Sequence, residues 1–451
     1  MSKFPFQLSI QCISPENRKE SLTCTALLRV IPGNRDVYEA SWNDRAVIAK
    51  VFSHKIRAKR HLRREWRGLN LLQERRLSSA KPLFYGRSDD GRWAVVVEKI
   101  LDSVTALEVF DGILEKSKKS DVLQLICKEI AKQHEEGVLQ KDLHLGNFLL
   151  GDEQVFALDP GGMKFFSHPI SRKTGLSQLA MLACHLYDDD TASTARLCED
   201  YFCVRGWQLE ESDKGWVQKR RSVHRKRVIR KALRKTLKEN TRFLRIQTDR
   251  FLAVLERKFC LGADPLDLIE QIDDLMDSGG VFKRGNTCYV SRVEWNGKNV
   301  VIKRYNHKGV IHSLRHTVKK SRAHRGWLNG HRLGFLNFRT PKPVAYIEQR
   351  RGLLVWTSYL ITEYLEGQTL YDYLRKNYDS KEQCLKATEQ VLKLLEKLGT
   401  YHISHGDMKH SNILLTDCGP ALTDLDSMKR SRCKWLYRRR LARDISRFKN
   451  P

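Results

Sequence analysis

Two sets of polar residues in this sequence share one spacing. The sets are Asp142, Asn147 and Asp159, and Asp407, Asn412 and Asp424; in each, the asparagine follows the first aspartate by five positions and precedes the second by twelve. Carboxylate and amide oxygens are hard ligands that suit Mg²⁺. A carboxylate beside a hydroxyl group orients that nucleophile and accepts its proton. The spacing therefore favours a site that handles phosphate groups.

A lysine ends an apolar, β-like run upstream of each set. Lys50 follows the run Arg45–Ala49, and Lys303 follows Lys298–Ile302. Transfer of a phosphoryl group needs positive charge at the non-bridging oxygens, and a lysine at this place holds the α- and β-phosphates of a nucleotide. Taken singly, each such residue is more often a solvated charge or a turn residue. The joint and repeated occurrence favours phosphoryl transfer.

Further matched positions indicate an internal repeat. Trp66 is followed by Pro82 and Trp327 by Pro343, at sixteen positions in both cases. Lysine, tryptophan, proline, the Asp–Asn pair and the last aspartate occur twice in the same order. We therefore predict two copies of one domain.

Each copy begins with a segment rich in predicted strands and ends with a segment rich in predicted helices, which predicts an α+β fold. In the second copy, Cys288–Trp295 and Asn299–Tyr305 flank Asn296-Gly297, a pair that fits the type I′ turn of a hairpin. Apolar spacing predicts a helix from about Lys381 to Leu398. Between the copies, a long helical segment is expected from about Lys219 to Phe259; its first part, Lys219–Lys238, holds eleven Lys or Arg and no acid.

These features predict three parts of the chain. Residues 1–215 form the first domain, 216–276 a basic helical connector, and 277–451 the second domain, because Gly262–Pro265 breaks the helix and Asp277–Gly280 opens the second copy.

Composition excludes several classes of protein. A hydrophobic share of 41% with many aromatic residues excludes global disorder, and no run approaches the roughly 18 apolar residues that cross a bilayer. The eleven cysteines contain no C-x-x-C pair, which argues against zinc or redox sites and favours reduced thiols in a cytosolic chain. The net charge of +29 predicts an anionic partner without identifying it.

The motifs His405–Leu415, Leu422–Asp426 and Val301–Tyr305, with Trp327–Leu333 running to Thr340–Ala345, resemble the bacterial lipopolysaccharide core kinases that phosphorylate heptose or Kdo. The resemblance implies two tandem protein-kinase-like domains, each with a β-rich N-lobe and a helical C-lobe, that use ATP and Mg²⁺. By the resemblance, Asp407 is the catalytic base, Lys303 binds phosphates, Asn412 and Asp424 hold Mg²⁺, and Thr362–Leu365, with Glu363 and Tyr364, is the adenine hinge.

The two copies differ in ways that leave alternatives open. Gly326 stands where the first copy has Glu65, so the sequence supplies no glutamate partner for Lys303. The first copy keeps Lys50, Glu65, Asp142, Asn147 and Asp159, and it is either a second active module or a scaffold. His405 is expected to be a structural histidine of the catalytic loop.

The expected acceptor is an anionic glycolipid, the lipopolysaccharide core, at an acidic membrane surface. The resemblance places the protein in the cytoplasm, peripheral at the inner face of the cytoplasmic membrane of a Gram-negative bacterium. The segment Lys219–Lys238 and the tail Lys429–Lys449 are either solvated faces or contacts to such a surface. A protein Ser/Thr or small-molecule kinase is one alternative, which the short C-lobe disfavours. The other is a pseudokinase scaffold that binds anionic partners, among which nucleic acid is not favoured.

Overall fold

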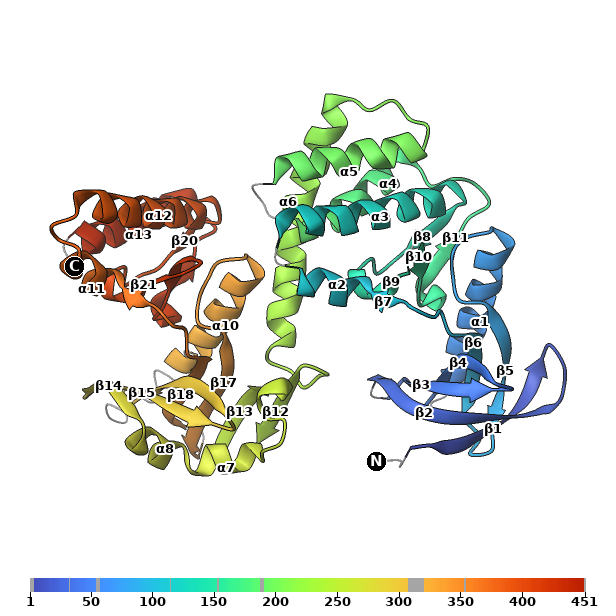
Figure 1. Ribbon diagram of the computed structural model, residues 1–451, viewed down its shortest axis with the longest axis horizontal. Coiled ribbons are helices and arrows are strands. Elements are labelled where there is room, and N and C mark those ends of the chain that lie inside the picture. The colour runs from blue at the N-terminus through green and yellow to red at the C-terminus, as the bar shows by residue number, and fades with distance from the viewer. Residues whose placement is uncertain are drawn as a thin grey trace. The chain divides into compact units, whose positions relative to one another are not determined.

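The computed structural model describes residues 4–31, 33–53, 57–113, 115–151, 154–186, 190–306, 320–352 and 354–449 (Figure 1). The chain divides into two compact units, Met1–Lys226 (unit 1) and Arg227–Pro451 (unit 2), with the boundary inside helix α6 (Glu211–Lys235). Each unit combines a β-rich lobe with a helix-rich lobe.

The β-rich lobe of unit 1 is a closed barrel in the order β1-β2-β3-β4-β6-β5. Its strands are β1 (Phe6–Ser14), β2 (Lys19–Ile31), β3 (Arg35–Trp42), β4 (Arg45–Phe52), β5 (Pro82–Ser88) and β6 (Trp93–Glu98), and helix α1 (Ala58–Glu74) follows β4. On β4, Val47, Ala49 and Val51 point into the barrel core. Because side chains alternate along a strand, Lys50 lies on the other face with Phe52, which packs with α1.

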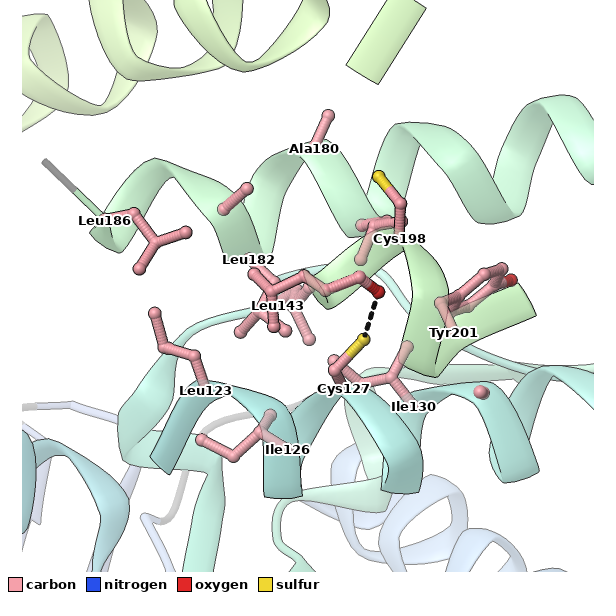
Figure 2. Close-up of a cluster of buried hydrophobic side chains, with 14 of the residues drawn as sticks. Leu123, Ile126, Cys127, Ile130, Leu143, Ala180, Leu182, Leu186, Cys198 and Tyr201 are labelled. Atoms are coloured by element: carbon pink, nitrogen blue, oxygen red, sulfur yellow. Dashed lines mark hydrogen bonds between the residues drawn. The ribbon is translucent and has the colours of Figure 1, made fainter. Parts of the chain in front are cut away.

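The helix-rich lobe of unit 1 forms its largest apolar core (Figure 2). Its helices are α2 (Ala106–Gly112), α3 (Lys116–Glu135), α4 (Arg172–Leu182), α5 (Thr191–Val204) and the start of α6; its short elements are β7 (Val104–Thr105), β8 (Val138–Gln140), η1 (Leu145–Asn147), β9 (Phe148–Leu150), β10 (Val155–Ala157), η2 (Pro160–Gly162), β11 (Met163–Phe165) and η3 (Ala183–His185). Leu123, Ile126 and Ile130 recur at helical spacing on α3 and are buried. The Cys127 thiol donates to the Leu197 carbonyl over 3.3 Å.

The β-rich lobe of unit 2 is a seven-stranded sheet in the order β12-β13-β17-β18-β16-β15-β14. The strands are β12 (Phe243–Gln247), β13 (Phe251–Glu256), β14 (Gly280–Gly285), β15 (Cys288–Trp295), β16 (Lys298–Tyr305), β17 (Pro343–Arg351) and β18 (Leu354–Glu363), with η4 (Arg257–Phe259), α7 (Pro265–Glu270), α8 (Ile272–Ser278) and α10 (Arg322–Phe335) beside them. Asn296 and Gly297 both have positive φ, as the type I′ turn requires.

The helix expected from Lys219 to Phe259 is wrong in its second half. Helix α6 ends at Lys235, and residues 243–247 and 251–256 are strands β12 and β13. After the turn at Thr248, residues Phe251–Leu255 form a short continuous apolar run, which is typical of a buried strand. The expected connector 216–276 therefore contributes two strands to the sheet of unit 2.

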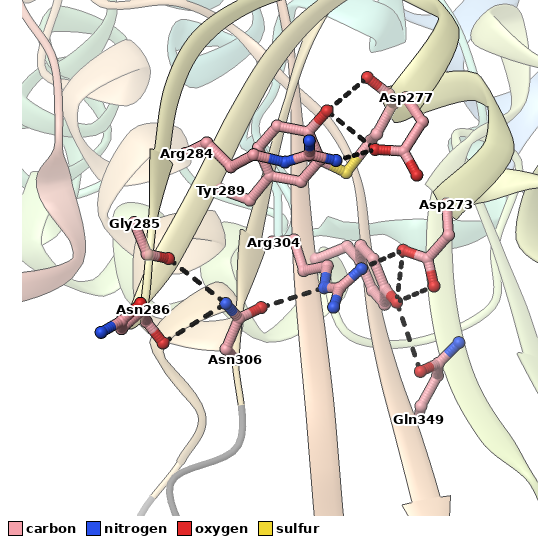
Figure 3. A network of polar contacts seen from close by, with 11 residues as sticks. Asp273, Asp277, Arg284, Gly285, Asn286, Tyr289, Arg304, Asn306 and Gln349 are labelled. Atoms are coloured by element: carbon pink, nitrogen blue, oxygen red, sulfur yellow. Dashed lines mark hydrogen bonds and ion pairs between the residues drawn. The ribbon is translucent and has the colours of Figure 1, made fainter.

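A polar network joins strand β16 to helix α8 and to the turn between β14 and β15 (Figure 3). Arg304 on β16 lies 3.0 Å from Asp273 of α8, and its Nε donates to Asn306 over 2.9 Å. Asn306 in turn donates to the carbonyls of Gly285 and Asn286 in the β14–β15 turn, over 3.4 Å each. The strand that carries Lys303 thus supports the turn between β14 and β15.

The helix-rich lobe of unit 2 is small. It contains β19 (Gln368–Thr369), α11 (Leu370–Lys376), α12 (Lys381–Thr400), β20 (Ile403–Ser404), η5 (His410–Asn412), β21 (Ile413–Thr416), β22 (Gly419–Leu422), η6 (Leu425–Ser427), β23 (Lys429–Arg430) and α13 (Lys434–Lys449). The helix expected at Lys381–Leu398 corresponds to α12. Among the described helices, none combines the length and the apolar character that a membrane span requires.

Candidate active sites

Unit 1 contains a neutral cluster of two cations and two carboxylates. Lys50 on β4 forms an ion pair with Glu65 of α1, and its Nζ lies 3.3 Å from Asp159 Oδ1. Arg35, the first residue of β3, donates to Asp159 Oδ1 over 2.5 Å and lies 3.7 Å from Glu65. Burial raises the pKa of Asp159, but the charges of Lys50 and Arg35 outweigh it and lower this pKa to about 2. Asp159 is thus held ionised.

Close packing brings α1 to the loop that carries Asp159. A Cβ atom on Gly68 would lie 2.8 Å from the Pro160 carbonyl oxygen, and one on Gly161 would lie 2.7 Å from Glu65 Oε2. Glycine at both positions lets the helix approach the loop, and the Gly161 N–H donates to Glu65 over 3.2 Å. Glu65 therefore joins the lysine strand to this loop.

The loop that carries Asp142 and Asn147 is held by the Asn147 side-chain amide and by hydrogen bonds between buried polar side chains before it. Asn147 donates from Nδ2 to the Asp142 carbonyl over 2.9 Å, and the Leu158 N–H donates to the Asn147 carbonyl over 2.8 Å. Gln140, two residues before Asp142, donates to Gln133 over 2.9 Å. These bonds hold Asp142 and Asn147 beside the segment that leads to Asp159.

Several residues of these two clusters line a cavity of about 350 Å³ in unit 1. Arg35, Glu65, Asp142, Asn147 and Asp159 all line it. Its volume lies in the range of small-molecule sites. The structure therefore brings four of the predicted residues of the first copy to one cavity and adds Arg35, while Lys50 contacts Glu65 and Asp159 of this lining.

In unit 2, Lys303 of β16 forms an ion pair with Asp424. Burial raises the pKa of Asp424, but the charge of Lys303 outweighs it and lowers this pKa. Gly326 on α10 stands at the place of Glu65, and a Cβ atom there would lie 2.6 Å from Leu360 Cδ2. A side chain at position 326 would therefore require Leu360 of the neighbouring strand β18 to move, and Gly326 itself supplies no carboxylate to Lys303.

A different ion pair joins α10 to the loop of Asp424. Arg322 donates from Nε to Asp426 Oδ2 over 2.6 Å, and Asp426 is 2% exposed. Asn329 donates to the carbonyls of Leu425 and Met428 over 2.8 and 3.0 Å. The unit 2 cluster therefore also contains two cations, Lys303 and Arg322, and two carboxylates, Asp424 and Asp426. In unit 2 the helix supplies a cation, whereas in unit 1 it supplies a carboxylate.

The catalytic loop of unit 2 has the internal geometry of its counterpart in unit 1. Asn412 donates to the Asp407 carbonyl over 2.8 Å, and the Thr423 N–H donates to the Asn412 carbonyl over 3.0 Å. Asp159 and Asp424 both have left-handed backbone, with φ of 55° and 54°. The same three residue types thus occur in the same local arrangement within each unit.

His405 and helix α13 hold this loop in place through hydrogen bonds. His405 is fully buried, and its ring Nε2 lies 2.9 Å from the Thr423 carbonyl oxygen, as expected of a structural histidine. Asp444 of α13 accepts from the N–H groups of His405 and Gly406 over 2.7 and 2.8 Å. Burial raises the pKa of Asp444, while these donated bonds oppose the rise.

Two cations surround the carboxylate of Asp407. Arg447 of α13 lies 3.1 Å from Asp407 Oδ1 and donates to the Gly406 carbonyl, and Lys409 lies 3.7 Å from the same carboxylate oxygen. Both cationic side chains are about half exposed. The surroundings of Asp407 therefore favour anionic groups.

The predicted hinge residues lie at the end of β18. The pairing of β16 with β18 places Glu363 opposite Val300 and Leu360 opposite Lys303. Three strand residues span about 10 Å, which leaves the length of a nucleoside between Glu363 and Lys303. Glu363 is paired with Lys342 at 3.3 Å, and the Arg292 guanidinium lies over the Tyr364 ring at 4.1 Å.

Sequence reasoning missed four residues of these sites. They are Arg35, Arg322, Asp426 and Asp444. None has a partner at a recognisable spacing, because their contacts join segments that are 38 to 124 residues apart. Only Asp426 carried a signal, because it lies two positions after Asp424.

Comparison with known proteins bears on unit 2. The model of the "Lipopolysaccharide kinase (Kdo/WaaP) family" matches residues 275–450, which hold Lys303, Asp407, Asn412 and Asp424. Unit 2 is a kinase-type phosphotransferase. The match covers less than half of the chain and leaves unit 1 unassigned. No curated protein matches the chain significantly by sequence.

Solved kinase structures are also similar to this chain. The PknI kinase domain of Mycobacterium tuberculosis is 18% identical, with 37% of this chain and 73% of that one covered and a TM-score of 0.28. A rhoptry kinase from Toxoplasma gondii is 15% identical, with 46% and 68% covered and a TM-score of 0.30.

Proposed function

We propose that unit 2 transfers the γ-phosphoryl group of ATP to a heptose or Kdo hydroxyl of the lipopolysaccharide inner core. The observation that carries this proposal is the arrangement of Asp407, Asn412, Asp424 and Lys303 within the region that the family model matches. The cations beside Asp407 agree with an anionic acceptor.

Lys303 would hold the nucleotide phosphates. Its ammonium group is paired only with Asp424 among the ion pairs of the described residues, so arriving phosphates compete with a single carboxylate. The end of β18, with Glu363 and Tyr364, would hold the adenine about 10 Å away.

Asn412 and Asp424 suit Mg²⁺ by their donor chemistry. Among the described residues, no group of three or more His, Cys, Asp or Glu is arranged to hold a metal ion. One carboxylate and one amide oxygen fit Mg²⁺, which is commonly held by one or two carboxylates together with substrate phosphates. When bound, Mg²⁺ would neutralise charge on the phosphate oxygens.

Asp407 would act on the acceptor. The acceptor hydroxyl oxygen forms a bond to the γ-phosphorus while the bond from that phosphorus to the β–γ bridging oxygen breaks, and its electron pair leaves with ADP. The hydroxyl proton passes to the Asp407 carboxylate. Asp444 keeps that carboxylate in place through the backbone of the two preceding residues.

We extend the proposal to unit 1 as a second kinase module. Lys50, oriented by its ion pair with Glu65, would bind phosphate, Asp142 would be the base, and Asn147 and Asp159 would hold Mg²⁺. The shared cavity supports this, because a scaffold has no need to assemble these groups at one place. Arg35 must release Asp159, or share it, when a nucleotide enters.

The proposed location is the cytoplasm, peripheral at the inner face of the cytoplasmic membrane of a Gram-negative bacterium. Helix α6 was one expected membrane contact, but part of its charge is internal. Arg221 and Arg225 are 1% and 6% exposed, and both donate to the Leu186 carbonyl. Its later cations, such as Arg227 and Arg230, are exposed.

The test uses γ-labelled MgATP with delipidated, unphosphorylated inner-core oligosaccharide. We expect label in the oligosaccharide with the wild type and a loss of about 100-fold or more with Asp407→Asn. Asp142→Asn reports on unit 1 in the same assay, and Glu366→Gln is an exposed control. Label in a generic protein acceptor only would favour a protein kinase, and no label with retained ATP binding would favour a scaffold.

A further inference from the structure

Helix α1 of unit 1 carries a cationic face. Five exposed residues make it, and we call them the α1 patch: Lys59, Arg60, Arg63, Arg64 and Arg67. Together they line a concavity of about 400 Å³. In the described part of the chain, no carboxylate forms an ion pair with any of them. The patch is therefore a concentrated and uncompensated positive charge.

The fold itself does not require this charge. In unit 2, α10 follows the lysine strand and packs on the loop after the metal-binding aspartate, as α1 does in unit 1. Every arginine of α10 is partly buried, and Arg322 forms an ion pair with Asp426. A helix in this position can thus fold without exposed cations, so the α1 patch calls for a functional reason.

The α1 patch adjoins the unit 1 cavity. Arg64 lines both the concavity and the cavity, and His61 of the same helix lines the cavity. Burial and then the charges of Arg64, Arg35, Arg57 and Arg60 lower the pKa of His61. An anion held by the patch would therefore lie at the entrance to the candidate site of unit 1.

The chemistry of the patch favours phosphate groups. Four of its five cations are arginines, whose guanidinium groups bind phosphate through two parallel hydrogen bonds. The patch runs from residue 59 to 67, which spans about 12 Å along the helix. That length suits a few neighbouring phosphate groups.

Two features favour lipid over nucleic acid. Stacking of bases needs an open aromatic face, whereas the Trp93 ring beside the patch is covered by Lys59 and Arg87 at 5.4 and 5.2 Å. Exposed apolar residues lie near the cavity instead: Leu28 is 52% and Val30 41% exposed, and the next residue, Ile31, lines the cavity. A lobe that carries both a cationic helix face and exposed apolar side chains suits a lipid surface.

We propose that the α1 patch is a docking surface for the phosphate headgroups of an acidic membrane, and that it places the unit 1 cavity at that surface. The choice of a membrane as partner rests on the proposed function. The docking itself is measured without ATP, and the kinase assay above uses a delipidated acceptor. Failure of one proposal is therefore distinguishable from failure of the other.

The experiment is co-sedimentation of the full chain with phosphatidylcholine vesicles, with and without phosphatidylglycerol. The test variant is Arg60→Glu/Arg63→Glu/Arg67→Glu, which spares the cavity residues His61 and Arg64. The control, Lys226→Glu/Arg227→Glu/Arg230→Glu on α6, changes the net charge equally at exposed positions. Circular dichroism and cooperative unfolding confirm that both variants fold.

We expect binding to the acidic vesicles only, weakened about 100-fold in the α1 variant and less than about tenfold in the α6 control. Equal losses in the two variants would show that the α1 patch has no special role in binding and would overturn the proposal. It would also be overturned by absence of vesicle binding, or by α1-dependent binding to a single-stranded RNA in place of vesicles.

Discussion

Arg322 Nε lies 2.6 Å from Asp426 Oδ2, and this ion pair ties helix α10 to the loop that carries Asp424. In unit 1 the helix supplies a carboxylate instead: Glu65 of α1 pairs with Lys50 of β4 and accepts from the Gly161 N–H of the loop that carries Asp159. Both arrangements are neutral and both fix the helix relative to the loop. The helix can therefore be docked without the glutamate that the sequence of unit 2 lacks.

Removal of Arg322 should destabilise unit 2. Asp426 is 2% exposed, so Arg322→Ala leaves a buried charge unpaired and should cost about 3 kcal/mol in the free energy of unfolding. The exposed pair of Arg284 and Asp277 is a matched control, and Arg284→Ala should cost about 1 kcal/mol or less. Urea unfolding measures both, and equal costs would contradict the assigned role of Arg322.

Gly326 should be coupled to Leu360. A Cβ atom at position 326 would lie 2.6 Å from Leu360 Cδ2, so Gly326→Ala should destabilise unit 2 by about 1–3 kcal/mol although alanine favours helix. In the Leu360→Ala background the clash is gone, and the same change should be neutral or stabilising. A double-mutant cycle in urea gives the coupling, and additivity within about 0.5 kcal/mol would refute it.

Local pattern was enough to predict much of the second unit. The hairpin around Asn296-Gly297 and the helix at Lys381 depend on turn chemistry and periodicity, which are readable within a few residues. The strands β12 and β13 were missed because the predicted helix was extended past Lys235, where α6 ends. The strand that joins β13 to the rest of the sheet, β17, lies about ninety residues away, as in the pair Val254 and Tyr346.

The same distinction between local and long-range signals applies to the candidate-site residues. Lys50, Asp142, Asn147 and Asp159 were predicted from spacing; the structure places the last three at one cavity and pairs Lys50 with Asp159. Arg35 was not predicted, because only the barrel brings the start of β3 to Asp159. Long-range contacts of this kind leave no periodic signal in a single sequence.

Glu129 should make the stability of unit 1 depend on pH. It is 6% exposed, accepts from Gln133 over 2.9 Å, and Gln133 in turn accepts from Gln140 of the catalytic loop. Burial raises the pKa of Glu129 from 4.5 to about 7, against the smaller effects of Gln133 and Lys132. The folded state thus prefers the protonated acid.

The sign of the effect follows from this raised pKa. The stabilising contribution is complete below about pH 4.5 and is lost as the pH rises through about 7, with a total near 3 kcal/mol. Glu129→Gln should therefore be about as stable as the wild type at pH 4.5 and more stable at pH 8. Urea unfolding across this range is the measurement, with exposed Glu136→Gln as the control. A difference that does not change with pH would contradict the buried, protonated state.

Asp444 should control the rate of transfer without touching the substrate. Its carboxylate accepts from the N–H groups of His405 and Gly406, directly before Asp407, and it is 4% exposed. Asp444→Ala should lower kcat by about 100-fold because misplacement of a catalytic group by about 1 Å has an effect of that size. The KM for ATP should stay within about threefold, since no hinge or phosphate contact changes.

The graded variant separates positioning from loss of structure. Asp444→Asn keeps one acceptor oxygen for the two N–H groups, and its kcat should lie between those of wild type and Asp444→Ala. Asp407→Asn removes the proposed proton acceptor and gives the lowest rate expected of this series. Because Asp444 is proposed to act through position and not as a proton acceptor, Asp444→Asn should keep the shape of the pH–rate profile at reduced height. Equal losses for Asp444→Asn and Asp444→Ala, together with a raised KM for ATP, would show that α13 supports the whole lobe and has no specific role at Asp407.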